Sequence, residues 1–328
     1  VMESGITLID DGRLHYRGRD VVDLAGKKSI EEVAALIWTG DEAMAPSLFP
    51  PGGLLLSGRI RAVLENVSGM TPVESFQVLL PLAAAEDPAA YDLRPLAVAR
   101  TGARILRLMT GVLSGEDAPG LAEALGRGWS PRGSGAGLLD AALVFCVDHE
   151  LPVSTFAARC VASSGATPYA VVLAGLAALG GVKHGGQIEH VEAFLREVEA
   201  AGDARVVISG RLRRGELIPG FGHSLYPEGD PRGAALLSLV AEKYPEDSGV
   251  GLCEDVAGEV LRLMGERPTV DFALATVARA LELPAGGAVA LFGLGRTVGW
   301  IGHAIEQYEG DSLIRPRARY VGEQPEAG

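Results

Sequence analysis

A histidine in a loop rich in glycine and proline is the first candidate for chemistry. Residues 219–232 contain three glycines and three prolines, a composition that excludes both a helix and a central strand. In the resulting loop, His223 and Arg232 could contact the same small anion. A surface turn with a solvated histidine would fit the same residues, so the loop alone leaves both interpretations open.

Two further histidines stand at breaks in the helical pattern. His149 follows the apolar segment 138–147, and His184 lies among four glycines. Glycine beside His184 and His223 indicates that another group approaches the backbone closely. No two histidines have the short spacing of metal ligands, and we predict no metal site. The others lack this setting and are expected to be structural or solvated: His15, His190 and His303.

Two charged residues stand among apolar neighbours. Asp271 follows Pro268 at the start of a predicted helix, where the residues alone favour a helix-capping role. Arg296 interrupts the apolar stretch 285–305, which we predict to be a long helix. A buried guanidinium needs an anionic partner, which could be a protein carboxylate or a substrate.

The elements that would position these residues are almost all helical. Residues 6–20 predict a hairpin with Asp11-Gly12 as its turn. Capping boxes at 29–32 and 71–74 predict helix starts, and Pro81 is expected to end or kink the second helix. Strands do not alternate with helices, which argues against a doubly wound sheet. Further helices are predicted at 93–113, 138–147, 155–163, 169–179, 186–199, 203–214, 234–243, 255–264 and 268–281.

Two loops and the chain ends complete this organisation. The Gly-Ser-Gly-Ala-Gly run at 133–137 could suggest a phosphate-binding loop, but no strand precedes it. The segment 314–321 is predicted to be extended and basic, and residues after Gly322 to be disordered. We also expect that residues precede Val1 in the natural chain.

Composition narrows the classes of function. The 328 residues carry a formal net charge of −13 without a long basic run, which argues against nucleic-acid binding. We see no apolar run of membrane-spanning length and expect no membrane partner. The three cysteines are odd in number and far apart, so we expect a cytoplasmic protein without disulfides: Cys146, Cys160 and Cys253.

Seven short motifs, in order along nearly the whole chain, carry a resemblance to a known family. The chain resembles the citrate synthase family in Tyr16-Arg-Gly-Arg-Asp20, Asp148-His-Glu with Ser154-Thr155, His184-Gly-Gly, Gly220-Phe-Gly-His with Asp230-Pro-Arg232, Val270-Asp-Phe272, Gly295-Arg-Thr-Val-Gly-Trp300 and Arg315-Pro-Arg317. The resemblance implies a mainly α, multi-helical homodimer with a small N-terminal hairpin. It further implies a large domain formed by 1–186 and 285–328, and a small domain formed by 187–284.

The resemblance also implies an acyltransferase that condenses an acyl-CoA thioester with oxaloacetate in the tricarboxylic acid cycle. Asp271 would remove a proton from the methyl group of the thioester. His184 would stabilise the enol or enolate, and His223 would polarise the ketone of oxaloacetate. Hydrolysis of citryl-CoA would then release CoA, with no cofactor beyond the thioester substrate.

The carboxylates of oxaloacetate would be held by a further set of residues. The resemblance assigns this role to His149, Arg232 and Arg296, and it implies that Arg315 reaches the site from the partner subunit. A dicarboxylate calls for arginine side chains, because their planar forks bind carboxylates in bidentate geometry.

Two departures from the family pattern leave alternatives open. Ser224 and Pro227 stand where the family has basic residues. The basic residue at the position of Pro227 helps hold CoA phosphates in the family, and Lys183, Arg213 or Arg214 could compensate. Gln187-Ile188-Glu189 follows His184-Gly-Gly where the family usually has Ala-Asn-Glu. The alternatives are a 2-methylcitrate synthase that uses propionyl-CoA, cleavage of a citryl-CoA-like thioester, and a non-catalytic paralogue that senses dicarboxylate or CoA.

Overall fold

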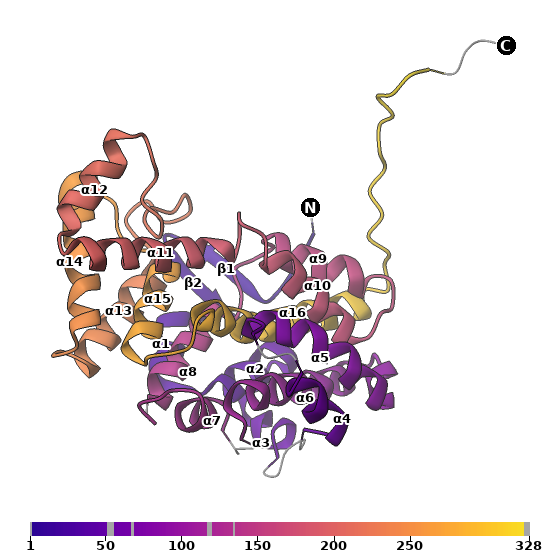
Figure 1. The fold of residues 1–328 in the computed structure, drawn as a ribbon. Coiled ribbons are helices and arrows are strands. Elements are labelled where there is room, and N and C mark those ends of the chain that lie inside the picture. The colour runs from indigo at the N-terminus through magenta and orange to yellow at the C-terminus, as the bar shows by residue number, and fades with distance from the viewer. Residues whose placement is uncertain (1, 51–55, 67–68, 117–119, 134, 325–328) are drawn as a thin grey trace.

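The computed structural model describes residues 2–50, 56–66, 69–116, 120–133 and 135–324. In these ranges the chain is mainly helical, with one small sheet near the N-terminus (Figure 1). Its α-helices are α1 (Val21–Lys27), α2 (Ile30–Thr39), α3 (Ala45–Leu48), α4 (Gly58–Leu64), α5 (Pro72–Glu86), α6 (Pro95–Ser114), α7 (Leu121–Gly128), α8 (Ala136–Cys146), α9 (Val153–Ala162), α10 (Pro168–Leu179), α11 (Gly186–Ala201), α12 (Ala204–Arg213), α13 (Pro231–Lys243), α14 (Ser248–Met264), α15 (Val270–Ala280) and α16 (Gly287–Glu309). The predicted mainly α fold with an N-terminal hairpin is confirmed.

The hairpin forms as predicted and gains a third short strand. Strands β1 (Thr7–Asp10) and β2 (Arg13–Tyr16) pair antiparallel. Asp11 and Gly12 both have positive φ, at 47° and 70°, which suits a two-residue hairpin turn. A further strand, β3 (Arg19–Asp20), pairs with β2 and was not predicted.

Helix starts follow the predicted capping boxes, whereas the predicted end at Pro81 is wrong and a kink there stays a prediction. Ser29 and Thr71 each cap a helix reciprocally with a glutamate three residues later. An end at Pro81 is wrong, because α5 continues through this proline to Glu86. Proline removes one backbone hydrogen bond, but the packing of α5 against α6, α10 and α16 compensates for that loss.

One buried helix forms the centre of the larger hydrophobic core. α16 packs against α2, α6, α8, α9 and α10 (Figure 1). Its length and composition would allow it to cross a membrane, contrary to the expectation of no such run, yet it is wholly buried as a core helix. A Cβ at Gly295 or Gly299 would lie 2.5 and 2.2 Å from the backbone oxygens of Leu143 and Val147. Glycine therefore lets α16 approach the end of α8 closely, where Arg296 donates to the backbone oxygen of Cys146.

A second, smaller hydrophobic core lies within the range predicted as the small domain. It consists of apolar residues of α11, α12, α14 and α15 and of the loop before α13: Val191, Phe194, Leu195, Val198, Val207, Ile208, Ile218, Phe221, Cys253, Val256, Val260, Phe272 and Ala275. Leu236 of α13 and Val270 of α15 instead pack in the larger core. The division at 187 and 284 therefore stays a prediction.

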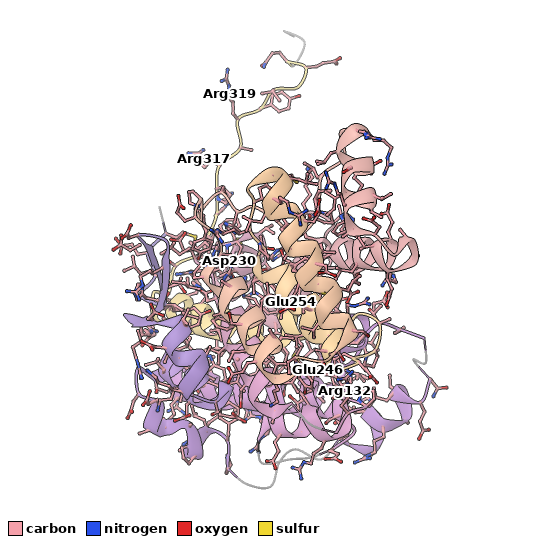
Figure 2. All side chains as sticks on the ribbon, turned by 90° about the vertical axis from the view of Figure 1, so that its left-hand side faces the viewer. Arg132, Asp230, Glu246, Glu254, Arg317 and Arg319 are labelled. Atoms are coloured by element: carbon pink, nitrogen blue, oxygen red, sulfur yellow. The ribbon has the colours of Figure 1, made fainter. Side chains whose placement is uncertain are left out.

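The described part of the C-terminal segment, 311–324, leaves the body of the protein. It has no regular secondary structure and nearly all of its residues are exposed. Arg317 and Arg319 project from it, away from the helices (Figure 2). The prediction of an extended basic tail is confirmed here, whereas Val1 and residues 325–328 lie outside the described residues.

Candidate functional site

Two of the predicted site histidines lie close together, although they belong to segments that pack in different hydrophobic cores. The rings of His149, just after α8, and His223, in the loop before α13, have centroids 5.5 Å apart. Nε2 of His149 lies 2.9 Å from the hydroxyl of Tyr226, which belongs to the same loop as His223. A cavity of about 590 Å³ beside them is lined by both histidines and by residues of the N-terminal segment.

The loop of His223 is held in a conformation that only glycine permits at two positions. Gly220 and Gly222 have φ of 86° and 73°. A Cβ at Gly220 would also lie 2.7 Å from the side chain of Val191. The glycines therefore shape the loop, as the sequence indicated, and they set the position of the imidazole.

The protonation of His223 follows from its contacts. Its Nδ1 lies 3.1 Å from the backbone N–H of Leu225, which donates to it. Burial and the Arg232 guanidinium lower the pKa of His223, although Asp230 opposes this effect. A neutral ring whose Nδ1 accepts a hydrogen bond carries its proton on Nε2, so Nε2–H is the donor available to a ligand.

His184 lies in a tight turn immediately before α11. Its Nε2 is 2.7 Å from Oγ of Ser154, and its ring contacts Phe292 edge-on. Burial, and then the charge of Arg296, lower the pKa of His184 to about 4. The ring is therefore neutral at physiological pH, and a Ser154 hydroxyl that donates to Nε2 leaves the proton on Nδ1.

Arg296 is a buried cation that contacts a backbone oxygen and an aromatic ring. It is 1% exposed, and its Nε donates to the backbone oxygen of Cys146 at 2.7 Å. Its guanidinium lies 4.6 Å from the centroid of the Phe292 ring. Within the described ranges, no carboxylate lies at ion-pair distance from Arg296, although the charge of Asp148 supports the cation at longer range. Of the two partners that the sequence left open, a substrate anion therefore fits better.

Arg232, in contrast, has a protein partner. Its Nε and Nη2 donate to the two carboxylate oxygens of Asp230, at 3.0 and 2.9 Å. Burial opposes ionisation of Asp230, but the guanidinium outweighs it and keeps the pKa of this carboxyl below its usual value. Asp230 also accepts from the backbone N–H of Val270 at 3.0 Å, which fixes the start of α15 beside Arg232.

Asp271 is the second residue of α15, and the N-cap is Thr269. The capping role that the residues alone favoured is therefore wrong. No group in the described part of the chain donates a hydrogen bond to the Asp271 carboxylate. Burial raises its pKa to about 6, against the opposing charge of Arg232, while Asp230 raises it further. A carboxylate with this pKa suits a general base near neutral pH.

His303 lies beneath the site and is structural, as expected. It is fully buried, and its Nε2 lies 3.2 Å from Oδ2 of Asp148, which also accepts from Thr7 at 2.6 Å. The backbone N–H of Asp148 donates to the buried hydroxyl of Tyr16. These contacts fix the backbone immediately before His149.

The structure brings six of the seven predicted site residues around one region and leaves Arg315 apart. Tyr226 contacts His149, His223 and Arg232, and the Phe292 ring lies against both His184 and Arg296. The charge of Arg296 acts on both His149 and Asp271, which places these two groups in the same region. Arg315 lies exposed in the tail. Three further residues contribute to the site, and the sequence analysis gave them no role: Ser154, Tyr226 and Asp230. Ser154 and Asp230 stand within the quoted motifs, and Tyr226 is three residues after His223.

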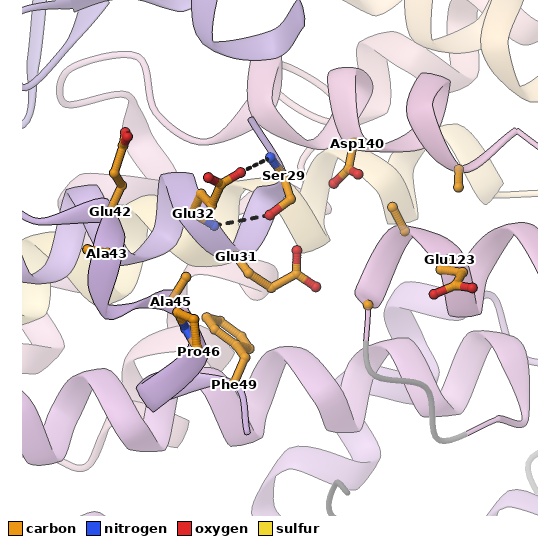
Figure 3. A pocket seen from close by; sticks show the side chains of 13 residues that line it. Ser29, Glu31, Glu32, Glu42, Ala43, Ala45, Pro46, Phe49, Glu123 and Asp140 are labelled. Atoms are coloured by element: carbon orange, nitrogen blue, oxygen red, sulfur yellow. Dashed lines mark hydrogen bonds between the residues drawn. The ribbon is translucent and has the colours of Figure 1, made fainter. Parts of the chain in front are cut away.

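A separate cavity of about 580 Å³ is acidic and contains none of these residues (Figure 3). Glu31 and Asp140 face it, and they accept hydrogen bonds from the backbone N–H groups of Leu121 and Ile30. Burial raises the pKa of Asp140 to about 7, although the hydrogen bond from Ile30 opposes it. Across the described ranges, no cluster of three or more potential metal-ligating side chains is present.

The structure defines a mainly α-helical protein in which three histidines, two buried arginines and a carboxylate gather near the junction of two cores. The family model described as "Citrate synthase, C-terminal domain" matches residues 1–317. The chain belongs to the citrate synthase family.

Relatives and solved structures agree with this assignment. A citrate synthase of Haloferax volcanii is 32% identical over 99% of this chain and 94% of the relative. A 2-methylcitrate synthase of Shewanella oneidensis is 28% identical over 95% of this chain and 89% of its own length. The structure of citrate synthase from Pyrobaculum aerophilum matches with a TM-score of 0.86 at 23% identity. The match covers 100% of this chain and 92% of that chain, and it supports the fold.

A second solved structure has the same fold and contains ligands. Citrate synthase from Thermoplasma acidophilum, described as a ternary complex with carboxymethyl coenzyme A and oxaloacetate, gives a TM-score of 0.84 at 23% identity. The match covers 100% of this chain and 95% of that chain.

Proposed function

We propose that this protein condenses an acyl-CoA thioester with oxaloacetate and then hydrolyses the product thioester. The observation that carries the proposal is Arg296, a buried guanidinium whose charge acts on both His149 and Asp271 and which has no carboxylate at ion-pair distance among the described residues. Its charge calls for an anion in the site, and oxaloacetate supplies two carboxylates. The named activities of the relatives and the ligands of the Thermoplasma structure support the same reaction.

The first step would be proton transfer from the α-carbon of the thioester. Asp271 accepts the proton, since burial leaves its carboxylate more basic than usual and no protein donor neutralises it. Nδ1–H of His184 donates a hydrogen bond to the thioester oxygen as the enolate forms. Ser154 holds the opposite nitrogen, so the donor is already oriented before charge develops.

The second step would form the carbon–carbon bond. Nε2–H of His223 donates to the ketone oxygen of oxaloacetate, because the backbone N–H of Leu225 occupies Nδ1. The enolate carbon attacks the polarised carbonyl carbon, and the new alkoxide takes the Nε2 proton of His223, which water later restores. Arg296 and Arg232 orient the carboxylates, and water then cleaves the thioester to release CoA.

Arg232, Arg296 and His149 would together bind the two carboxylates of oxaloacetate. Arg232 keeps one edge of its guanidinium on Asp230, so only its remaining nitrogens are available to substrate. Arg296 has no such partner and would form the stronger contact. Both acetyl-CoA and propionyl-CoA remain candidate donors, since relatives of both kinds match the chain.

A different arginine could replace the basic residues that the His223 loop lacks. Of the candidates suggested by the sequence, Arg214 is paired with Glu216. Arg267 lies next to the His223 loop. Its backbone oxygen accepts a hydrogen bond from the N–H of Gly222 at 3.0 Å. Its Cδ would lie 2.6 Å from a Cβ placed at Gly229. Its side chain therefore lies along this loop, and among the described residues it forms no ion pair. We propose that it contacts a CoA phosphate.

Assembly and location are further parts of the proposal. The exposed tail suits contact with a second copy, and Arg315 would complete the partner's site in a homodimer. The reaction needs no cofactor beyond its thioester substrate, and we propose a cytoplasmic enzyme of the tricarboxylic acid cycle.

The test is release of free thiol from acetyl-CoA and, separately, from propionyl-CoA, each with and without oxaloacetate. Release that depends on oxaloacetate supports the condensing enzyme, and the ratio of the two rates identifies the donor. Binding of oxaloacetate without thiol release from either donor would contradict the proposal and favour a sensor.

A further inference from the structure

Tyr226 contacts the site from a position that the sequence did not single out. Its side chain is 2% exposed, and its hydroxyl lies 2.9 Å from Nε2 of His149. Two successive turns fix its backbone, because its N–H donates to His223 and its oxygen accepts from Gly229. Its ring also lies 5.6 Å from the Arg232 guanidinium. The hydroxyl is therefore held in place and is not a mobile surface group.

The direction of the hydrogen bond follows from the chemistry of its two partners. Burial and the neighbouring charges of Arg232 and Arg296 lower the pKa of His149, so its ring is neutral. Burial raises the pKa of Tyr226 to about 12, so the phenol keeps its proton. A neutral imidazole has one donor and one acceptor nitrogen, and an anionic ligand requires the donor. The hydroxyl must then donate to Nε2.

We propose that Tyr226 is a positioning residue that places the His149 proton on Nδ1, where it can bind a carboxylate of the ketoacid substrate. This inference rests on the proposed function for the identity of that substrate. Without the hydroxyl, Nε2 could carry the proton and Nδ1 would present a lone pair to an anion. Since Tyr226 and His223 share one loop, the same contact would also link the two histidines.

The first experiment reads the tautomer directly in the full chain labelled with ¹⁵N-histidine. NMR at pH 7.5 should show the His149 proton on Nδ1, with Nε2 unprotonated. His149→Gln assigns the signal. In Tyr226→Phe, the signal should shift toward the Nε2–H form. A wild-type protein with the His149 proton on Nε2 would overturn the proposal, whatever the variant does.

The second experiment uses kinetics with a matched control. Tyr226→Phe should raise the KM for oxaloacetate about tenfold, the size expected for one lost hydrogen bond, and leave the KM for the acyl-CoA donor unchanged. Tyr308→Phe removes a tyrosine hydroxyl away from the site, which donates to the backbone oxygen of Ala166, and should change neither KM. Equal KM values for oxaloacetate in Tyr226→Phe and wild type would refute the inference. If the wild type releases no thiol, the proposed function fails, while the tautomer experiment still tests the contact.

Discussion

Asp271→Asn should abolish catalysis and yet stabilise the folded protein at alkaline pH. Burial raises the pKa of Asp271 from 3.8 to about 6, so ionising this carboxylate costs more in the folded state than in the unfolded chain. A difference of about 2 in pKa corresponds to about 3 kcal/mol. This is an upper limit, because the side chain keeps some contact with solvent.

The sign of the pH dependence follows from proton binding. Between pH 4 and 6 the folded protein binds more protons at Asp271 than the unfolded chain does. The contribution of this residue to the free energy of unfolding therefore falls as pH rises through that window, and it stays low above about pH 6. Asparagine does not ionise. The free energy of unfolding of Asp271→Asn, relative to the wild type, should therefore rise from pH 4 to 6 and then remain constant.

Urea unfolding at pH 4.5, 5.5, 7 and 8, followed by circular dichroism, measures the effect. Asp255→Asn, which changes an exposed carboxylate of α14, is the matched control and should show no such gain. Thiol release by Asp271→Asn should be at background. The reasoning is refuted if the variant gains no stability at pH 8, or if its gain does not change with pH.

Three further changes test other parts of the site. Arg296→Gln should raise the KM for oxaloacetate by roughly a hundredfold, because it removes the charged partner of a carboxylate, and an unchanged KM in steady-state kinetics would exclude that contact. Ser154→Ala should lower kcat about tenfold at saturating substrates, since His184 loses the partner of its Nε2; a full kcat would show that the 2.7 Å contact does not orient the ring. Arg267→Ala should raise the KM for acyl-CoA about tenfold but not for its dephospho analogue, with Arg100→Ala, an exposed residue of α6, as control. Equal losses with both donors would argue against a phosphate contact.

Much of the fold could be predicted from local sequence signals. The capping boxes at Ser29 and Thr71 and the turn at Asp11-Gly12 depend on neighbouring residues, and all form as expected. The end predicted at Pro81 was wrong, because packing along α5 outweighs the loss of one hydrogen bond. Such packing involves helices far apart in sequence, so local propensity cannot reveal it.

Contacts between residues far apart in sequence also limited what could be predicted of the site. Glycines beside His184 and His223, and the charge of Arg296 in an apolar helix, marked these residues before the structure. The hydroxyl of Ser154 is 30 positions from His184, and that of Tyr226 is 77 positions from His149, so no local pattern links them. The capping role suggested for Asp271 depended on where α15 begins, and Asp230 fixes that position from 40 residues away.

The most direct test of the proposed reaction is the stoichiometry of its products. Acetyl-CoA or propionyl-CoA, labelled in the acyl group, is incubated with oxaloacetate, and the products are measured by mass spectrometry and thiol titration. The account predicts one labelled tricarboxylate for each thiol released by the wild type, and neither product from Asp271→Asn. Thiol release without a labelled tricarboxylate, or equal product formation by the variant, would contradict it.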